Sequence, residues 1–223
     1  MKNIVFIVAH PDDMAYGMSG TAWLLKEKYN LHVLCATRGE KGLPGVKTEK
    51  EAAAIREKEE LAASRDLLGA NVTFLDRIDR EVFADKVTSE KVAEILIELN
   101  PIAVFTLWPI DSHPDHSAVS ELTKKAIFLS ELDCELLFCE ESLDSQTTQF
   151  QPDIYIDISS VMKFKLQMLR KHVCQNSNDK MAQSAIKQSG ARGMKRNVEY
   201  AEGFKTIHPL GTTRKNSILL ELL

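Results

Sequence analysis

Two short clusters of histidine and aspartate are the residues of this chain best suited to chemistry. The first is His10-Pro11-Asp12-Asp13, which directly follows the apolar run 4–8. The second is His113-Pro114-Asp115-His116, which follows the apolar run 102–107. Imidazole and carboxylate groups bind divalent metals, and two histidines with one carboxylate are a common donor set for catalytic zinc. We therefore expect the two clusters to share one metal ion.

The spacing within each cluster supports a shared metal. His10 and Asp13 are three residues apart, as are His113 and His116, and on a helical turn this spacing places both side chains on one side. A proline occupies the intervening first-turn position of each cluster, where its missing N–H costs least. From spacing alone the candidate ligands are His10, Asp13 and one of the two later histidines. Asp12, beside a ligand, is the candidate general base.

Each cluster taken alone is also typical of a capped helix start. The presence of both, each after an apolar run, favours the metal site. The identity of the metal stays open between zinc and another divalent ion such as Fe²⁺, because nonhaem iron also uses two histidines and a carboxylate.

The apolar pattern predicts a sheet that would bring both clusters to one edge. We expect strands at residues 4–8, 31–36, 72–75, 102–108, 136–139 and 154–158. We expect helices at residues 20–29, 48–68, 89–99, 115–129, 161–173, 179–187 and 197–204, with Gly190 and Gly193 interrupting the last two. Strands that are apolar throughout indicate a parallel α/β sheet covered on both faces. Such sheets bind ligands outside the carboxyl ends of their strands.

Composition excludes several classes of function. The formal net charge is −4 and no basic stripe with interleaved aromatic residues is present, so we expect no nucleic-acid partner. No apolar stretch approaches the roughly 18 residues of a membrane span. The four cysteines lack CxxC spacing, which indicates reduced thiols and a cytoplasmic protein. No shift in composition divides the chain, so we expect a single domain over residues 1–223.

Several motifs together resemble those of one enzyme family, the LmbE/PIG-L-like zinc deacetylases. The two His/Asp clusters are the most specific of them. The others are Gly17-x-Ser19-Gly20-Thr21, Thr37-Arg38-Gly39-Glu40, Arg56-x-x-Glu59, Leu68-Gly69, Asp157-Ile158, Lys165 and His172-x-x-Gln175. The resemblance implies a Rossmann-like three-layer sandwich with a mostly parallel central sheet. It also implies removal of an acetyl group from an N-acetylglucosamine-type conjugate or a related small N-acetylated substrate.

The resemblance also implies a role for each residue of the two clusters. His10, Asp13 and His116 would bind zinc, and Asp12 would be the general base. His113 would stabilise the oxyanion or protonate the leaving amine, with Asp115 orienting it. A carboxylate next to His113 is expected to favour the imidazolium form of that ring.

The chain departs from the family pattern directly after the aspartate pair. A glutamate is common there, whereas this chain has Met14 and Ala15, which puts the shape of the pocket wall in doubt. Arg38, Glu40 and Arg56 are further candidates for substrate binding. The alternatives are a surface ion pair for Arg38 and Glu40 and a solvated helix face for Arg56.

Two other readings of the site remain open. One is a metallohydrolase acting on an ester or phosphoester, and the other is a non-catalytic sugar- or metal-binding module. The partner is expected to be a small amino-sugar conjugate, whose other half would be selected by loops at 39–47 and 143–152. The apolar helices of the second half leave room for a homo-oligomer. His172 and His208 are lone histidines, expected at the surface or the edge of the core.

Overall fold

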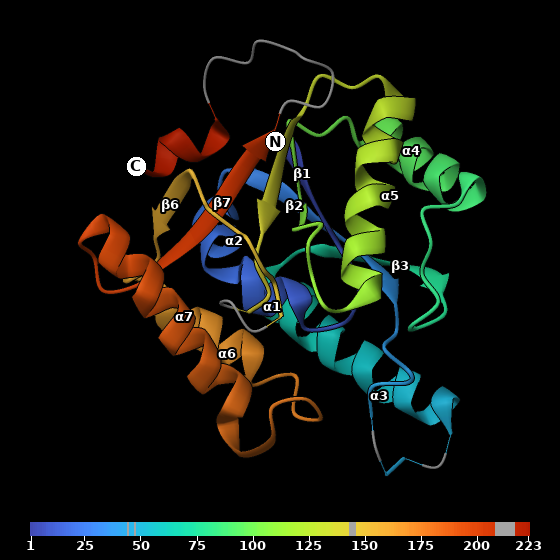
Figure 1. Ribbon diagram of the computed structural model, residues 1–223, viewed down its shortest axis with the longest axis horizontal. Helices are drawn as coiled ribbons and strands as arrows, with labels where there is room; N and C mark the ends of the chain where they lie inside the picture. The colour runs from blue at the N-terminus through green and yellow to red at the C-terminus, as the bar shows by residue number, and fades with distance from the viewer. Residues whose placement is uncertain (44, 47, 143–145, 208–216) are drawn as a thin grey trace.

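The computed structural model of the chain has one seven-stranded sheet with helices on both of its faces (Figure 1). It describes residues 1–43, 45–46, 48–142, 146–207 and 217–223. The strand order is β3-β2-β1-β4-β5-β7-β6. The strands are β1 (Lys2–Val8), β2 (Tyr29–Thr37), β3 (Asn71–Arg77), β4 (Ala103–Leu107), β5 (Glu135–Cys139), β6 (Ile154–Asp157) and β7 (Ala201–Ile207).

The first five strands are parallel, and their order places the two sequence clusters side by side. Strand β1 pairs with β2 on one side and with β4 on the other, with Ile7 opposite Thr106. The chain therefore winds in one direction from β1 and in the other from β4, which makes the β1/β4 boundary the topological switch point where such sheets bind ligands. The fully buried residues 4–8 and the buried β4 form the centre of the core.

The helices form two layers over the sheet. One layer consists of α4 (Lys86–Leu99) and α5 (Pro114–Ser130), which pack against each other (Figure 1). On the other face, α6 (Met162–Leu169) packs against α1 (Asp13–Gly17), α2 (Ser19–Leu25) and α7 (Lys180–Arg196). The same face carries α3 (Glu49–Glu60), which continues as a π-helix over Leu61–Leu68. This π-helix contacts α6. Two short 3₁₀ turns lie at Ser177–Asp179 and Ile218–Leu222. The expected three-layer α/β fold is confirmed.

A buried ion pair fixes the start of α2 close to the site. The Glu202 carboxylate accepts the N–H groups of Gly20 and Thr21 at 2.9 and 2.7 Å. Lys165 donates to Glu202 at 2.6 Å and also to the Tyr16 carbonyl. Glu202 therefore acts as the cap that Met18, the N-cap residue of α2, does not supply through its side chain.

Strand β7, the last strand in chain order, was expected to be a helix, and that prediction is wrong. A helix was expected at 197–204, but Asn197 has a φ of 60° and ends α7, and β7 follows as a strand. Strand β7 is antiparallel to both β5 and β6, and its first four residues are buried. Pairing on both sides, rather than β-propensity, specifies this strand.

The glycines of α7 do not interrupt it, contrary to expectation. The helix runs through Gly190 and Gly193 to Arg196. At Gly193 a Cβ would lie 2.6 Å from the Val198 carbonyl oxygen, so the glycine allows the following turn to fold back over the helix. All four cysteines are free, with Cys174 half-buried and the others buried, as expected for reduced thiols.

Candidate metal and catalytic site

Both sequence clusters lie in the turns that leave the carboxyl ends of β1 and β4. His113 is the N-cap of α5, and Pro114 occupies the first turn of that helix. Asp13 begins α1, and its Oδ2 accepts the N–H groups of Ala9 and His10, each at 2.9 Å. These backbone bonds hold Asp13 at the switch point, with its other carboxylate oxygen facing His116.

Donor atoms of three side chains lie close together at this point. His116 Nε2 lies 3.3 Å from His10 Nδ1 and 3.6 Å from Asp13 Oδ1. His10 Nδ1 lies 3.7 Å from Asp13 Oδ2. A tetrahedral zinc with bonds of about 2.0–2.1 Å separates its ligand atoms by about 3.3–3.4 Å. The two ring nitrogens have this separation, and each lies 3.6–3.7 Å from one of the two Asp13 oxygens, so the donor types and their proximity suit a divalent metal.

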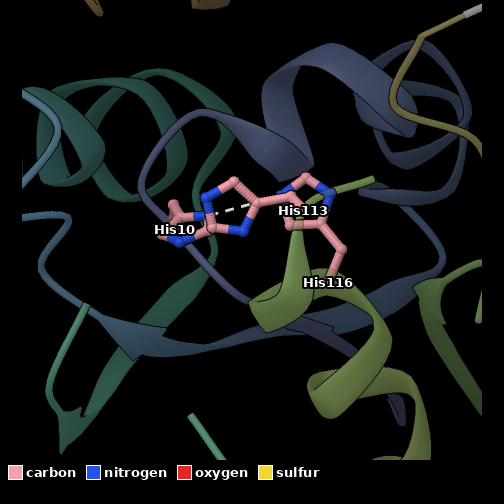
Figure 2. Close-up of side chains that lie close together, drawn as sticks. All are labelled: His10, His113 and His116. Carbon is pink, nitrogen blue, oxygen red and sulfur yellow. Dashed lines mark hydrogen bonds between the residues drawn. The ribbon is translucent and has the colours of Figure 1, made fainter. Parts of the chain in front are cut away.

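The third imidazole of the site, His113, lies next to the other two (Figure 2). Its ring centroid is 4.6 Å from that of His10 and 4.9 Å from that of His116. Nitrogen atoms of the three rings lie within 4.8 Å of one another. Spacing left the choice between His113 and His116 open, and the geometry gives His116 the contact with Asp13.

Carboxylates bind the outer nitrogens of the two candidate ligand rings. His10 Nε2 lies 3.2 Å from Asp115 Oδ2 and 3.3 Å from Asp79 Oδ1. His116 Nδ1 lies 3.3 Å from Asp111 Oδ2 and 2.9 Å from the Gln146 amide nitrogen. Carboxylates in this position fix the ring orientation and tautomer, which directs the inner nitrogens at the metal.

The charges of the cluster shift the pKa values of its members. Burial alone would raise the pKa of Asp13, but the charge of His116 and the hydrogen bonds and charge of His10 hold it well below its usual range. Burial would likewise raise the pKa of Asp79, whereas its contact with His10 lowers it to about 2. Burial would lower the pKa of His10, but Asp115, Asp13 and Asp79 raise it well above the ordinary value.

Asp12 lies beside these ligands in the wall of the cavity. Its Oδ1 accepts from Arg56 Nη2 at 3.1 Å, and its side chain is 14% exposed. Burial raises the pKa of Asp12 to about 6, against the opposing charge of Arg56. A carboxyl with a pKa near 6 is mostly ionised at neutral pH and basic enough to accept a proton there.

The surroundings of His113 differ from those expected. Its Nδ1 accepts the Asp115 backbone N–H at 3.3 Å, so the ring proton is placed on Nε2. The Asp115 carboxylate instead accepts from the N–H groups of Arg80 and Val82 and contacts His10. Burial, with the charges of His10 and His116, lowers the pKa of His113. The expected imidazolium is therefore wrong, and Asp115 orients His113 through its backbone.

The candidate substrate residues divide into two groups. Arg56 lines the cavity, although it is buried and donates to the Pro11 and Gly39 carbonyls at 2.7 and 3.0 Å. Arg38 pairs with Glu57 and Asp76, and Glu40 Oε1 accepts the Asp79 N–H at 2.8 Å. Neither Arg38 nor Glu40 is among the described residues that line the cavity.

A cavity of about 460 Å³ opens over the cluster, within the usual size range of small-molecule sites. Gln175, from the motif His172-x-x-Gln175, lines it, but much of its wall comes from residues that no motif identified. They are Tyr16, Gly42, Arg80, Glu141, Ser142, Gln146, Lys180, Met181 and Ser184. Asp79 and Asp111 were also missed. The only available signal was for Asp111, which stands two residues before His113 at the end of β4.

Several further expectations concern the edges of this cavity. Met14 and Ala15, where this chain departs from the family pattern, are fully buried and are not among the described residues that line it. Gly42 and Gln146 lie in the two loops expected to select the substrate, while residues 44, 47 and 143–145 of those loops are outside the described residues. His172 is buried rather than at the surface, and His208 is outside the described residues.

Comparison with known proteins supports the interpretation of this geometry. Residues 5–127 match the family model of GlcNAc-PI de-N-acetylase, PIG-L. A 4-oxalmesaconate hydratase of Pseudomonas putida is 25% identical and covers 93% of this chain and 90% of its own. A probable N-acetyl-alpha-D-glucosaminyl L-malate deacetylase 2 of Bacillus subtilis is 26% identical over 77% of this chain and 82% of its own.

A solved structure with a similar fold also belongs to a deacetylase. The N,N'-diacetylchitobiose deacetylase of Pyrococcus horikoshii superposes with a TM-score of 0.84 at 26% identity, covering 96% of this chain and 88% of its own. The family model spans more than half of the chain and includes both His/Asp clusters. The expected resemblance is thus confirmed, and the chain belongs to the PIG-L de-N-acetylase family.

Proposed function

We propose that the protein is a metal-dependent amidohydrolase that removes the acetyl group from an N-acetylglucosamine-type conjugate or a similar small N-acetylated substrate. The observation that carries this proposal is the convergence of His10, Asp13 and His116 donor atoms beside Asp12 in one cavity. A purely structural metal site would need no additional carboxylate next to its ligands. The deacetylases among the relatives agree with this chemistry.

His10, Asp13 and His116 would hold the metal, with zinc as the first candidate and Fe²⁺ as the alternative. When bound, such an ion polarises a carbonyl oxygen and lowers the pKa of a coordinated water toward about 7. The carboxylates of Asp79 and Asp111 orient the two histidine rings from outside.

The chain's own groups would carry the proton transfers. Asp12 accepts a proton from the water that attacks the acetyl carbon, and Arg56 keeps its carboxylate in place. His113, neutral and protonated on Nε2, donates a hydrogen bond to the developing oxyanion. The proton that Asp12 accepted from the water then passes to the leaving nitrogen. The C–N bond then breaks to give acetate and a free amine.

A second candidate activity is the addition of water to an unsaturated polycarboxylate. The P. putida hydratase matches nearly the whole chain. Addition of water to a double bond also needs a base at the position of Asp12. Three cationic side chains that could receive substrate carboxylates line the cavity, namely Arg56, Arg80 and Lys180.

Metal analysis combined with a substrate panel separates these candidates. We expect about one zinc per chain and amine release from N-acetylglucosamine conjugates that a chelator stops and zinc restores. Hydration of an unsaturated tricarboxylate, or cleavage of chromogenic esters or phosphoesters without amine release, would replace the deacetylase with that activity. Bound metal with no turnover of any of these would favour a binding module, and absence of metal after zinc loading would contradict the shared site.

The proposed function implies a small-molecule substrate. A homo-oligomer and a cytoplasmic location stay predictions from the sequence. Within the described part of the chain, no helix has the length and apolar character needed to cross a membrane.

A further inference from the structure

The backbone of Asp12 has a conformation that aspartate rarely adopts. Its φ is 106° and its ψ is −30°, at the point where the chain turns from β1 into α1. A non-glycine residue keeps such a conformation only where its surroundings hold it there. Asp12 is also the candidate base, so the groups that hold this backbone determine where its carboxylate points.

One of those groups is a carboxyl that the proposed chemistry does not use. Glu60 Oε2 accepts the Asp12 backbone N–H at 3.3 Å, and Glu60 is fully buried on the last turn of α3. Its other oxygen accepts from Ser64 Oγ at 2.6 Å. One turn earlier on the same helix, Arg56 donates to the Pro11 carbonyl and to the Asp12 side chain. The Asp12 turn is therefore held by two residues of α3.

Two features of the fold deliver Glu60 to this position. Helix α3 changes into a π-helix directly after Glu60, and single π-helical turns are frequent at functional sites. His172 also lies next to this carboxyl, with its Nε2 3.7 Å from Glu60 Oε2 and without a hydrogen-bond partner among the described residues. His172 is buried too, so Glu60 is enclosed and directed at Asp12.

We propose that Glu60 is a positioning residue for the general base, holding the Asp12 N–H so that the Asp12 carboxylate faces the metal-binding cluster. The inference rests on the proposed function, because it assigns Asp12 the role of base. It depends on the reach of an acceptor oxygen and not on the charge of Glu60. A charge role and a positioning role therefore predict opposite orders for two conservative substitutions.

The substitutions Glu60→Gln and Glu60→Asp separate these roles. Glutamine keeps an acceptor oxygen at full length without the charge, whereas aspartate keeps the charge on a side chain shorter by one methylene. We expect Glu60→Gln to retain kcat within about threefold. We expect Glu60→Asp to lower kcat about ten- to hundredfold, because small misplacements of a catalytic group cost this much. KM and the zinc content per chain are expected to change little in both variants.

Glu59→Asp is the matched control, because it shortens the neighbouring carboxyl on the same helix. Glu59 accepts the Cys174 backbone N–H at 3.1 Å, away from Asp12. Its kcat is expected to stay near that of the unmodified protein. Equal kcat in Glu60→Asp and the unmodified protein, or a loss in Glu60→Gln with activity kept in Glu60→Asp, would overturn the proposal.

A measurement that needs no substrate keeps this test separate from the proposed function. Hydrogen exchange at the Asp12 amide, followed by NMR, is expected to be slow in the unmodified protein and in Glu60→Gln and faster in Glu60→Asp. If the protein released no amine but showed this exchange pattern, the proposed deacetylase function would be rejected and the proposed contact between Glu60 and the Asp12 amide would be kept. Equal exchange in all three proteins would refute the positioning contact, whatever the activity.

Discussion

Replacing Glu60 by glutamine should stabilise the protein at alkaline pH and change its stability little in acid. Burial raises the pKa of Glu60 from 4.5 to about 7, against hydrogen bonds from Ser64 and Asp12 that lower it. A carboxyl whose pKa is higher in the folded state than in the unfolded state is harder to ionise in the folded state. The fold is therefore most stable at a pH low enough for the carboxyl to be protonated in both states. That contribution is fully present below pH 4.5 and is lost as the pH rises through about 7.

The size of the effect follows from the shift. Between 4.5 and about 7, at about 1.4 kcal/mol per pKa unit, the total is about 3 kcal/mol. Glutamine does not ionise, so the Glu60→Gln variant does not lose this stability as the pH rises. The variable to compare is the free energy of unfolding of Glu60→Gln minus that of the unmodified protein. This difference should be about 2–3 kcal/mol larger at pH 8.5 than at pH 5, in the direction of a more stable variant. Urea denaturation of both proteins at the same zinc loading measures this double difference.

Two outcomes would refute this reasoning. A stability difference that is the same at both pH values would mean that Glu60 is already ionised at pH 5, with a buried partner such as His172 carrying the compensating proton. Burial lowers the pKa of His172 to about 3, which argues against that partner. An equal pH-dependent gain in Glu59→Gln would show that the effect belongs to the helix as a whole and not to Glu60.

Three further predictions concern the metal and the base. Asp12→Asn should keep stoichiometric zinc but lower kcat by at least about a hundredfold, and near-normal turnover would remove Asp12 from the role of base. His116→Ala should lose both zinc and activity, and elemental analysis showing full zinc content would contradict its role as a ligand. Asp79→Asn should weaken zinc binding about 10- to 100-fold, because the Asp79 carboxylate contacts the outer nitrogen of His10. Competition with a chelator measures this affinity, and an unchanged value would mean that Asp115 alone orients the His10 ring.

The sequence allowed the centre of the site to be predicted because the information there is local. His10 and Asp13 belong to one turn, and His113 and His116 to another, and each turn follows a mostly apolar strand. Parallel strands end at the same edge, so the two turns had to converge once β1 and β4 were neighbours. The five parallel strands were predictable for the same reason, since each is marked by its own apolar run.

The remaining parts depend on contacts between distant residues. Asp79 reaches His10 from the loop after β3, next to Asp76 and Arg80, both of which have positive φ, and no spacing in the sequence indicates this contact. Glu60 and Glu59 are adjacent acidic residues on a charged helix, yet only Glu60 turns inward to Asp12. Strand β7 was missed because its neighbours β5 and β6 specify it, not its own composition.

The division of the site between two parts of the chain explains how one family can hold enzymes with different substrates. The span that matches the family model, 5–127, contains the candidate ligands, the base and Glu60. Part of the cavity wall comes from beyond that span, including Gln146, Gln175 and Met181. Tyr16 joins the two parts by a hydrogen bond of 2.8 Å to Ser184 on α7. Substitutions in the later wall can reshape the cavity without replacing the candidate ligands or the candidate base.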